Sequence, residues 1–125
     1  MDRKEYAVSL FKKDCNCCQA VLCAFSDELG RKGMMKLGAA FGLGMGNMEG
    51  TCGALVAAEM LLGLRKYEGK PMIKQARAVS ELFRTMTGAT ICKDIKGRDT
   101  GEILCSCEDC VRNAVTIAES RLYEK

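Results

Sequence analysis

Apolar residues recur at helical spacing along almost the whole sequence, and this constrains the fold more than any other feature. The clearest stripe has intervals of four and three residues, at Met72, Ala76, Val79, Phe83 and Met86. Helices are predicted over about 2–13, 17–29, 32–43, 52–64, 71–87 and 107–122. The sequence therefore predicts an all-α fold: a compact bundle of five to six helices with a glycine-rich loop near residue 45 and a cysteine-bearing crossing loop over 89–101.

Length and charge restrict the class of protein. With 125 residues, 48% of them hydrophobic, the chain predicts one domain over 1–125. The net charge of +3 is spread evenly, which argues against nucleic-acid binding. The longest apolar stretch, 54–64, contains Glu59 and falls short of the roughly 20 residues of a membrane span, so no membrane insertion is expected. The charged start is not a signal sequence, and a cytoplasmic location is predicted.

The chain has nine cysteines and no histidine. Histidine-based catalysis, histidine metal ligands and covalent haem attachment through CxxCH are therefore excluded. Any bound metal must be held mainly by sulfur. No acid–base or nucleophile arrangement stands out besides the thiols, so the sequence does not decide whether the protein is an enzyme. The odd number of cysteines makes complete internal disulfide pairing impossible.

Three of the predicted helices begin with a cysteine, and a loop supplies a fourth. Cys17, Cys52 and Cys107 are each expected at a first helical position, and Cys92 lies in the crossing loop. The predicted N-cap residues are Asn16, Thr51 and Ser106. Unpaired N–H groups and the helix dipole favour a thiolate at such a position. Because four gathered thiolates repel one another, they require a cation or disulfide pairing, and the pattern indicates a metal centre or a redox couple.

Other interpretations apply to particular cysteines. Cys23 lies in the middle of an apolar helical face and is expected to be a small core residue. Cys107-x-x-Cys110 is consistent with a dithiol of lowered pKa, with two ligands of one metal, or with coincidence. A thioredoxin-like motif would need strands that this pattern lacks. Adjacent Cys17 and Cys18 point about 100° apart on a helix, so they are not expected to share one site fully.

The segments NCCQAVLCAF at 16–25, GTCGALVAAEMLLGL at 50–64, TGATICKDIKG with its isolated cysteine, and CEDCVRNAV at 107–115 together resemble the redox-active proteins known by the pattern C_GCAxxG_C_C. The likeness covers about residues 10–120. The family's cysteines correspond to Cys17, Cys52, Cys92 and Cys110, and the central motif to Gly50, Gly53 and Ala54. Cys18 stands where a small residue is usual, and Ala57 or Ala58 where a later glycine is usual.

The resemblance implies a helical domain with a four-cysteine redox or iron–sulfur site. The family is similar to the cysteine-bearing part of split-Soret cytochromes, which are dimeric, but the haem motif is missing here, so no haem is expected. A homodimer and an unidentified redox partner are expected by the same likeness. Reasoning from helix starts favours Cys107 as a ligand, whereas the family match favours Cys110. Cys110 is taken as primary, with Cys107 and Cys18 as alternates.

Three hypotheses follow from these residues. The leading one is an iron–sulfur cluster, of the 2Fe–2S type, held by Cys17, Cys52, Cys92 and Cys110 for electron transfer or redox sensing. The second is a metal-free thiol–disulfide oxidoreductase or sensor, with Cys107 and Cys110 as the simplest pair. The third is a structural zinc site in an interaction domain. In the first, Gly50 and Gly53 would keep the backbone close to the sulfur-bound centre.

Overall fold

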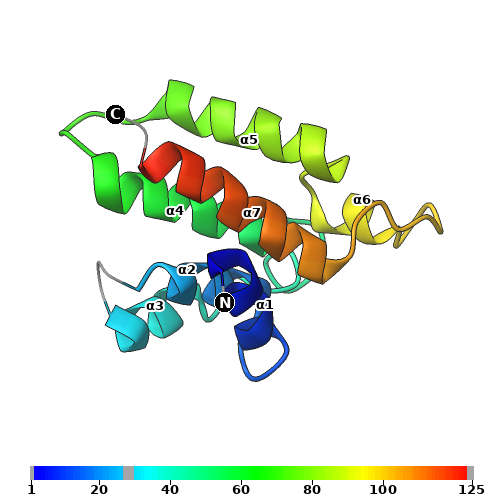
Figure 1. Cartoon of the computed structure of the whole chain (residues 1–125). Coiled ribbons are helices and arrows are strands. Elements are labelled where there is room, and N and C mark those ends of the chain that lie inside the picture. Colours follow the sequence, from blue (N-terminus) through cyan, green and yellow to red (C-terminus); the bar gives the residue numbers. More distant parts are fainter. Residues whose placement is uncertain (1, 27–29, 124–125) are drawn as a thin grey trace.

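The computed structural model describes residues 2–26 and 30–123, and these form seven helices (Figure 1). The helices are α1 (Arg3–Phe11), α2 (Cys17–Ala24), α3 (Gly30–Gly38), α4 (Gly53–Lys66), α5 (Ile73–Thr87), α6 (Cys92–Lys96) and α7 (Cys107–Leu122). The described residues contain no strand, only an isolated antiparallel bridge between Thr51 and Ile91. The predicted all-α class is confirmed, with one helix more than expected.

The additional helix is α6, which occupies part of the predicted crossing loop. It begins at Cys92 and ends before Gly97, whose φ of 72° is left-handed and stops the helix. Five residues are too few to produce a periodic apolar pattern, so this helix could not be recognised from the sequence. As a result, Cys92 lies at a helix start like the cysteines of the other elements.

Some predicted boundaries are wrong by several residues. Helix α2 ends at Ala24 because Phe25 leaves the helical region at φ −122° and ψ 43°, whereas the prediction extended to Gly30. Residues 27–29 of that prediction lie outside the described residues. Helix α3 ends at Gly38 rather than near 43, and α5 begins after Met72 rather than at Pro71. These differences shorten the helices but leave their order unchanged.

Helix α7 is the central element of the bundle. It packs against α1, α2, α4 and α5, and Figure 1 shows it lying between α5 and the α1–α2 pair. The side chains that it buries are Cys110, Val111, Ala114, Val115, Ile117, Ala118 and Leu122. Burying a valine or leucine side chain contributes about 1.5–3 kcal/mol each, before the entropy cost of ordering is subtracted. Packing around α7 therefore fixes where its first turn lies.

Helix α4 lies against α2 and α7 through small residues. Ala54, Ala57 and Ala58 are almost completely buried, together with Leu55 and Leu61. Short side chains let the helix backbones approach closely, so the starts of α2, α4 and α7 are brought to one end of the bundle. No helix in the described ranges is both long and apolar enough to cross a bilayer.

Candidate thiol and metal site

Cys17 is held at the start of α2 by a reciprocal capping arrangement. The Asn16 side chain accepts from the Gln19 N–H at 2.8 Å, and the Gln19 side chain accepts from the Asn16 N–H at 2.9 Å. Asn16 Nδ2 also donates to the carbonyls of Gly38 and Ala39 at 3.0 and 3.1 Å, which ties the α2 start to the end of α3. The predicted cap is confirmed, and Cys17 is the first residue of the helix.

Cys52 is the N-cap residue of α4, not its first helical residue as predicted from Thr51. Thr51 instead forms the bridge with Ile91, and the Cys52 N–H donates to the Thr90 carbonyl at 2.8 Å. These contacts hold the backbone of residues 51–52 extended, so the helix begins one residue later than predicted. The cysteine still lies at the positive end of the helix dipole.

The glycine-rich segment over 42–50 fixes the start of α6. The Cys92 N–H donates to the Gly50 carbonyl at 3.0 Å, and the Lys93 N–H donates to the Met48 carbonyl at 2.7 Å. Three non-glycine residues of the segment, Leu43, Met45 and Met48, have positive φ of 51°, 65° and 65°. Strain of this kind persists only where surrounding contacts impose it. The segment therefore supports the backbone at Cys92 through these two hydrogen bonds.

Cys107 and Cys110 occupy the first turn of α7. The Ser106 hydroxyl accepts from the Asp109 N–H at 3.1 Å, which confirms the predicted N-cap. Cys107 is exposed, whereas only 1% of Cys110 is exposed. The two thiols approach the same space from different sides, one from solvent and one from the core.

One cavity of about 270 Å³ collects these cysteines. Its lining is Phe11, Asn16, Cys17, Leu43, Cys52, Gly53, Cys92, Lys96, Cys107 and Cys110. The structure thus places the four predicted primary cysteines, the alternate Cys107, and Gly53 on one cavity. It places Cys18 elsewhere, because that side chain is completely buried in the core. Gly50 and Ala54 lie near the cavity in the chain but do not line it.

Gly53 adjoins one of the predicted sulfur ligands. A Cβ added to Gly53 would lie 2.2 Å from the Phe41 carbonyl oxygen and 2.7 Å from Cys17 Sγ. At Gly50 an added Cβ would meet the Met45 side chain at 2.3 Å and the Gly44 carbonyl oxygen at 2.9 Å. Both positions are therefore closed to any side chain, but only Gly53 is closed by a cavity thiol.

Gly44 is a further glycine whose backbone lies close to a cavity cysteine, and it was not among the predicted site residues. An added Cβ there would lie 2.4 Å from Cys92 Cβ, and its φ of 53° is left-handed. A glycine is needed for both reasons. The density of glycines around residue 45 was visible in the sequence, but nothing in it indicated which glycine faces Cys92.

The thiols of the cavity are unequal in acidity. Interactions with the thiols of Cys110 and Cys17 lower the pKa of Cys52. The N–H groups of Ala54 and Leu55 at the start of α4 act in the same direction. The Cys52 side chain makes no capping hydrogen bond of ordinary length to them. The same interactions with Cys52, followed by burial, raise the pKa of Cys17 and Cys110. Cys52 is consequently the most acidic of the three thiols, and its two neighbours hold their protons more tightly than a free cysteine does.

Lys96 is the cationic residue of the cavity lining. Its Nζ lies 3.8 Å from Cys110 Sγ and 3.1 Å from the Cys105 carbonyl oxygen. Burial acts to lower the pKa of Lys96, but the sulfurs of Cys110, Cys107 and Cys52 together raise it. The ammonium therefore stays charged and offsets thiolate charge. Lys96 was not predicted as a site residue, because its spacing of four residues from Cys92 places the two on one face only if the segment is helical.

The described residues contain no group of three or more cysteine, aspartate or glutamate side chains arranged to hold a metal ion. Within the cavity, Cys52 interacts with both Cys110 and Cys17. Four thiolates hold a 2Fe–2S cluster, and they are divided between two irons. The type and number of the thiol donors in the cavity match such a cluster.

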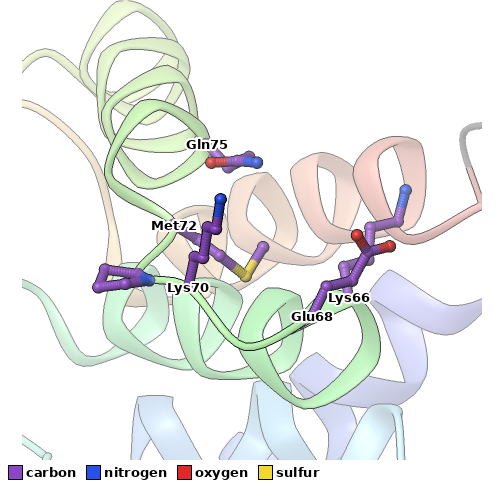
Figure 2. A pocket seen from close by; sticks show the side chains of 6 residues that line it. Lys66, Glu68, Lys70, Met72 and Gln75 are labelled. Atoms are coloured by element: carbon purple, nitrogen blue, oxygen red, sulfur yellow. The ribbon is translucent and has the colours of Figure 1, made fainter.

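A second hollow of about 500 Å³ lies at the turn between α4 and α5. It is lined by Lys66, Glu68, Lys70, Pro71, Met72 and Gln75, and Figure 2 shows Lys70 and Met72 on the turn below Gln75. It contains no cysteine and is larger than the cysteine cavity. Its lining of long, flexible and mostly polar side chains offers no fixed chemistry comparable to five thiols.

Comparison with known proteins gives one match. The model of the family described as putative redox-active protein (C_GCAxxG_C_C) matches residues 15–121. No curated protein and no solved structure matches the chain. The matched range contains all of the cysteines that line the cavity.

Proposed function

Because this chain belongs to the C_GCAxxG_C_C family of redox-active proteins, we propose that its cysteine cavity binds an iron–sulfur cluster of the 2Fe–2S type. The role of the cluster is electron transfer or redox sensing. One observation carries the proposal: cysteines from the starts of four separate helices line a single cavity of about 270 Å³. Cysteines placed only for core packing would have no reason to gather at helix starts.

The proposed ligands are Cys17, Cys52, Cys92 and Cys110, with Cys107 as an alternate for the last. Cys52 is already disposed to be a thiolate, whereas the raised pKa values of Cys17, Cys92 and Cys110 mean that these thiols release protons when they bind iron. The bound cluster would supply one-electron transfer.

The remaining lining residues have separate tasks in this proposal. Phe11 and Leu43 limit the access of water to the sulfurs, and Gly53 leaves space beside Cys17. The Lys96 ammonium offsets part of the negative charge of four thiolates. Hydrogen bonds and charges around the sulfurs are known to set the reduction potential of such sites, so Lys96 and the N–H groups at the α4 start would act on it.

Anaerobic reconstitution with iron and sulfide tests the proposal. We expect Cys52→Ser to lose most of the bound iron, because Cys52 lies between two other proposed ligands. The matched control is Cys23→Ser, which alters another buried cysteine that does not line the cavity. Equal iron content in the two variants would contradict the assignment of the cavity. Zinc in place of iron and sulfide in the purified protein would contradict it as well.

A metal-free thiol–disulfide function is the second candidate, and the lowered pKa of Cys52 favours it. It requires a persistent thiolate in protein that contains no metal. Ultraviolet absorbance of the reduced protein should then reveal thiolate at pH 6 that is absent in Cys52→Ser. If the wild type carries no thiolate at that pH, this candidate fails.

We also propose that the protein works in the cytoplasm as a homodimer with a separate redox partner. The family likeness supports the dimer, and so do the exposed apolar side chains of Leu43 and Met45 on the glycine-rich segment. Sedimentation of wild type and of Leu43→Ser/Met45→Ser tests it, because a dimer formed through this segment would dissociate in the variant.

A further inference from the structure

Cys105 has no part in the cavity lining but lies directly behind one of its thiols. It is the residue before Ser106, the N-cap of α7, and Cys110 is the fourth residue of that helix. Side chains at these two positions regularly pack against each other at helix starts. In this protein both are cysteines, so the two side chains are brought together at the start of α7. Burial raises the pKa of Cys105, and its interaction with Cys110 acts against that rise.

Neighbouring groups hold the two cysteines in this relation. Lys96 Nζ contacts the Cys105 carbonyl oxygen at 3.1 Å and Cys110 Sγ at 3.8 Å, so one ammonium binds to both residues. Asn113 Nδ2 lies 3.9 Å from Cys105 Sγ, and the same amide donates to the Thr87 hydroxyl at 3.0 Å. The Asn113 amide therefore ties the Cys105 thiol to the body of α7.

Exposure gives the pair an order of reaction. Cys105 is partly accessible, whereas only 1% of Cys110 is exposed. Of these two thiols, a soluble oxidant reaches Cys105 first, and the buried Cys110 thiol is then the one that attacks it. Cys107 is exposed as well, and it is the alternative partner that the experiment must separate from Cys105.

We propose that Cys105 and Cys110 form a reversible disulfide that removes Cys110 from the cavity, so that oxidation of this pair controls cluster loading. The pairing itself stands on the positions of the two residues at the start of α7 and on the Lys96 ammonium that contacts both of them. Its regulatory consequence rests on the proposed function, because only a thiolate at Cys110 can bind iron.

The reaction is a thiol–disulfide exchange with a low-molecular-weight disulfide as the oxidant. The Cys105 thiolate, after losing its proton to water, attacks one sulfur of the oxidant; the oxidant's S–S bond breaks and one thiolate leaves. Cys110 then loses its proton, attacks Cys105 Sγ, and displaces the second thiolate. Two protein thiols are oxidised to one disulfide, and one disulfide is reduced to two thiols. The Lys96 ammonium stabilises the Cys110 thiolate as it forms.

The pairing is tested in metal-free protein treated with oxidised glutathione under native conditions and digested with trypsin. Peptide 99–112 contains Cys105, Cys107 and Cys110 and no internal cleavage site. In Cys107→Ser we expect this peptide to lose two hydrogens without gaining glutathione. In Cys105→Ser we expect a glutathione adduct and no closure. If Cys105→Ser closes as fast as Cys107→Ser does, then Cys107 is the partner of Cys110 and the inference is overturned.

Iron uptake after oxidation tests the regulatory part. Oxidised wild type should take up less than a fifth of the iron bound by reduced wild type, and a phosphine reductant should restore uptake. Oxidised Cys105→Ser, freed of its adduct by mild thiol exchange, should bind iron as the reduced form does. Equal loss of uptake in both proteins overturns the regulation. If reduced wild type binds no iron, the proposed function fails and the regulation fails with it, whereas the peptide mass still decides the disulfide.

Discussion

Adjacent residues on α2 show the difference between the two kinds of cysteine in this protein. Cys17 lines the cavity, whereas Cys18 is completely buried in the core with Cys15 and Cys23 close by in the chain. A helix turns 100° per residue, so neighbouring side chains enter different environments. The largest cause that raises the pKa of Cys17 is its interaction with Cys52. For Cys18 the largest cause that raises the pKa is burial.

The comparison teaches that the direction in which a cysteine side chain points, toward the cavity or toward the core, separates the two groups, and not burial or cysteine content. We call Cys15, Cys18 and Cys23 the core cysteines. Each has its pKa raised chiefly by burial, as expected for small apolar side chains. Cys15 also contacts Met35 Sδ at 3.6 Å, a sulfur contact of ordinary packing. The cavity cysteines instead lie near the Lys96 ammonium, near N–H groups at helix starts, and near one another.

The largest effect is expected from a side chain at Gly53. Gly53→Val would place atoms within 2.2 Å of the Phe41 carbonyl and against Cys17 Sγ, so we expect loss of nearly all iron binding and a stability loss of at least about 2 kcal/mol. Iron analysis and urea unfolding measure the two. The control is Gly63→Ala on the same helix, where an added Cβ meets nothing and stability should rise by about 0.5–1 kcal/mol. Full iron content in Gly53→Val would show that Gly53 serves helix packing alone and has no role beside the sulfurs.

Substituting the two adjacent cysteines of α2 one at a time tests the comparison directly. Cys17→Ser should lose most of the iron with little change in stability, because the side chain is only partly buried. Cys18→Ala should retain the iron and lose about 1 kcal/mol, as is common for a small core truncation. Iron content with thermal unfolding distinguishes them. The reverse pattern, with iron lost in Cys18→Ala alone, would place the site on the other face of α2.

Alkaline pH should destabilise the reduced, metal-free protein through the core cysteines. Burial raises the pKa of Cys18 from 9.0 to about 12, so the folded state keeps its proton while the unfolded state loses it. A thiol whose pKa is raised by folding contributes its full stability to the folded state at pH values below its pKa in the unfolded chain, here 9.0. That contribution is lost as the pH rises from there toward the folded pKa. For Cys18 the loss is about 1.4 kcal/mol by pH 10. Urea unfolding at pH 8 and 10 should show this drop, and Cys18→Ala should reduce it; an unchanged drop would contradict burial as the cause.

The smallest expected effect comes from Lys96. Lys96→Met removes the ammonium 3.8 Å from Cys110 Sγ, so thiolate formation at Cys110 becomes less favourable. Glutathione-driven closure of peptide 99–112 in Cys107→Ser should slow by roughly tenfold, which corresponds to one pKa unit. Lys96→Arg, which keeps the charge, should restore most of the rate. An unaffected rate in Lys96→Met would show that the cation does not act on this thiol.

Much of the site was predictable because helix starts follow local rules. Asn16 with Gln19, and Ser106 with Asp109, cap their helices as the sequence indicates, and they set Cys17 and Cys107 in place. The start of α4 was predicted one residue early because the pairing of Thr51 with Ile91 is a contact between distant segments. Such contacts leave no local pattern.

Lys96 and Cys105 were missed for the same physical reason. Lys96 faces the sulfurs only because residues 92–96 form a short helix, and five residues give no detectable period. Cys105 lies outside the predicted helix, and its contact with Cys110 depends on how the chain enters α7. Helical period and capping indicated which cysteines could meet, but the charges and neighbours around them required the tertiary arrangement.

Iron and sulfide analysis of wild-type protein prepared without oxygen, together with its visible absorption spectrum, tests the central claim most directly. The account predicts a coloured protein with about two irons and two sulfides per chain, the composition of a cluster held by four cysteines. A colourless protein without stoichiometric iron, even after reconstitution in reductant, would contradict it.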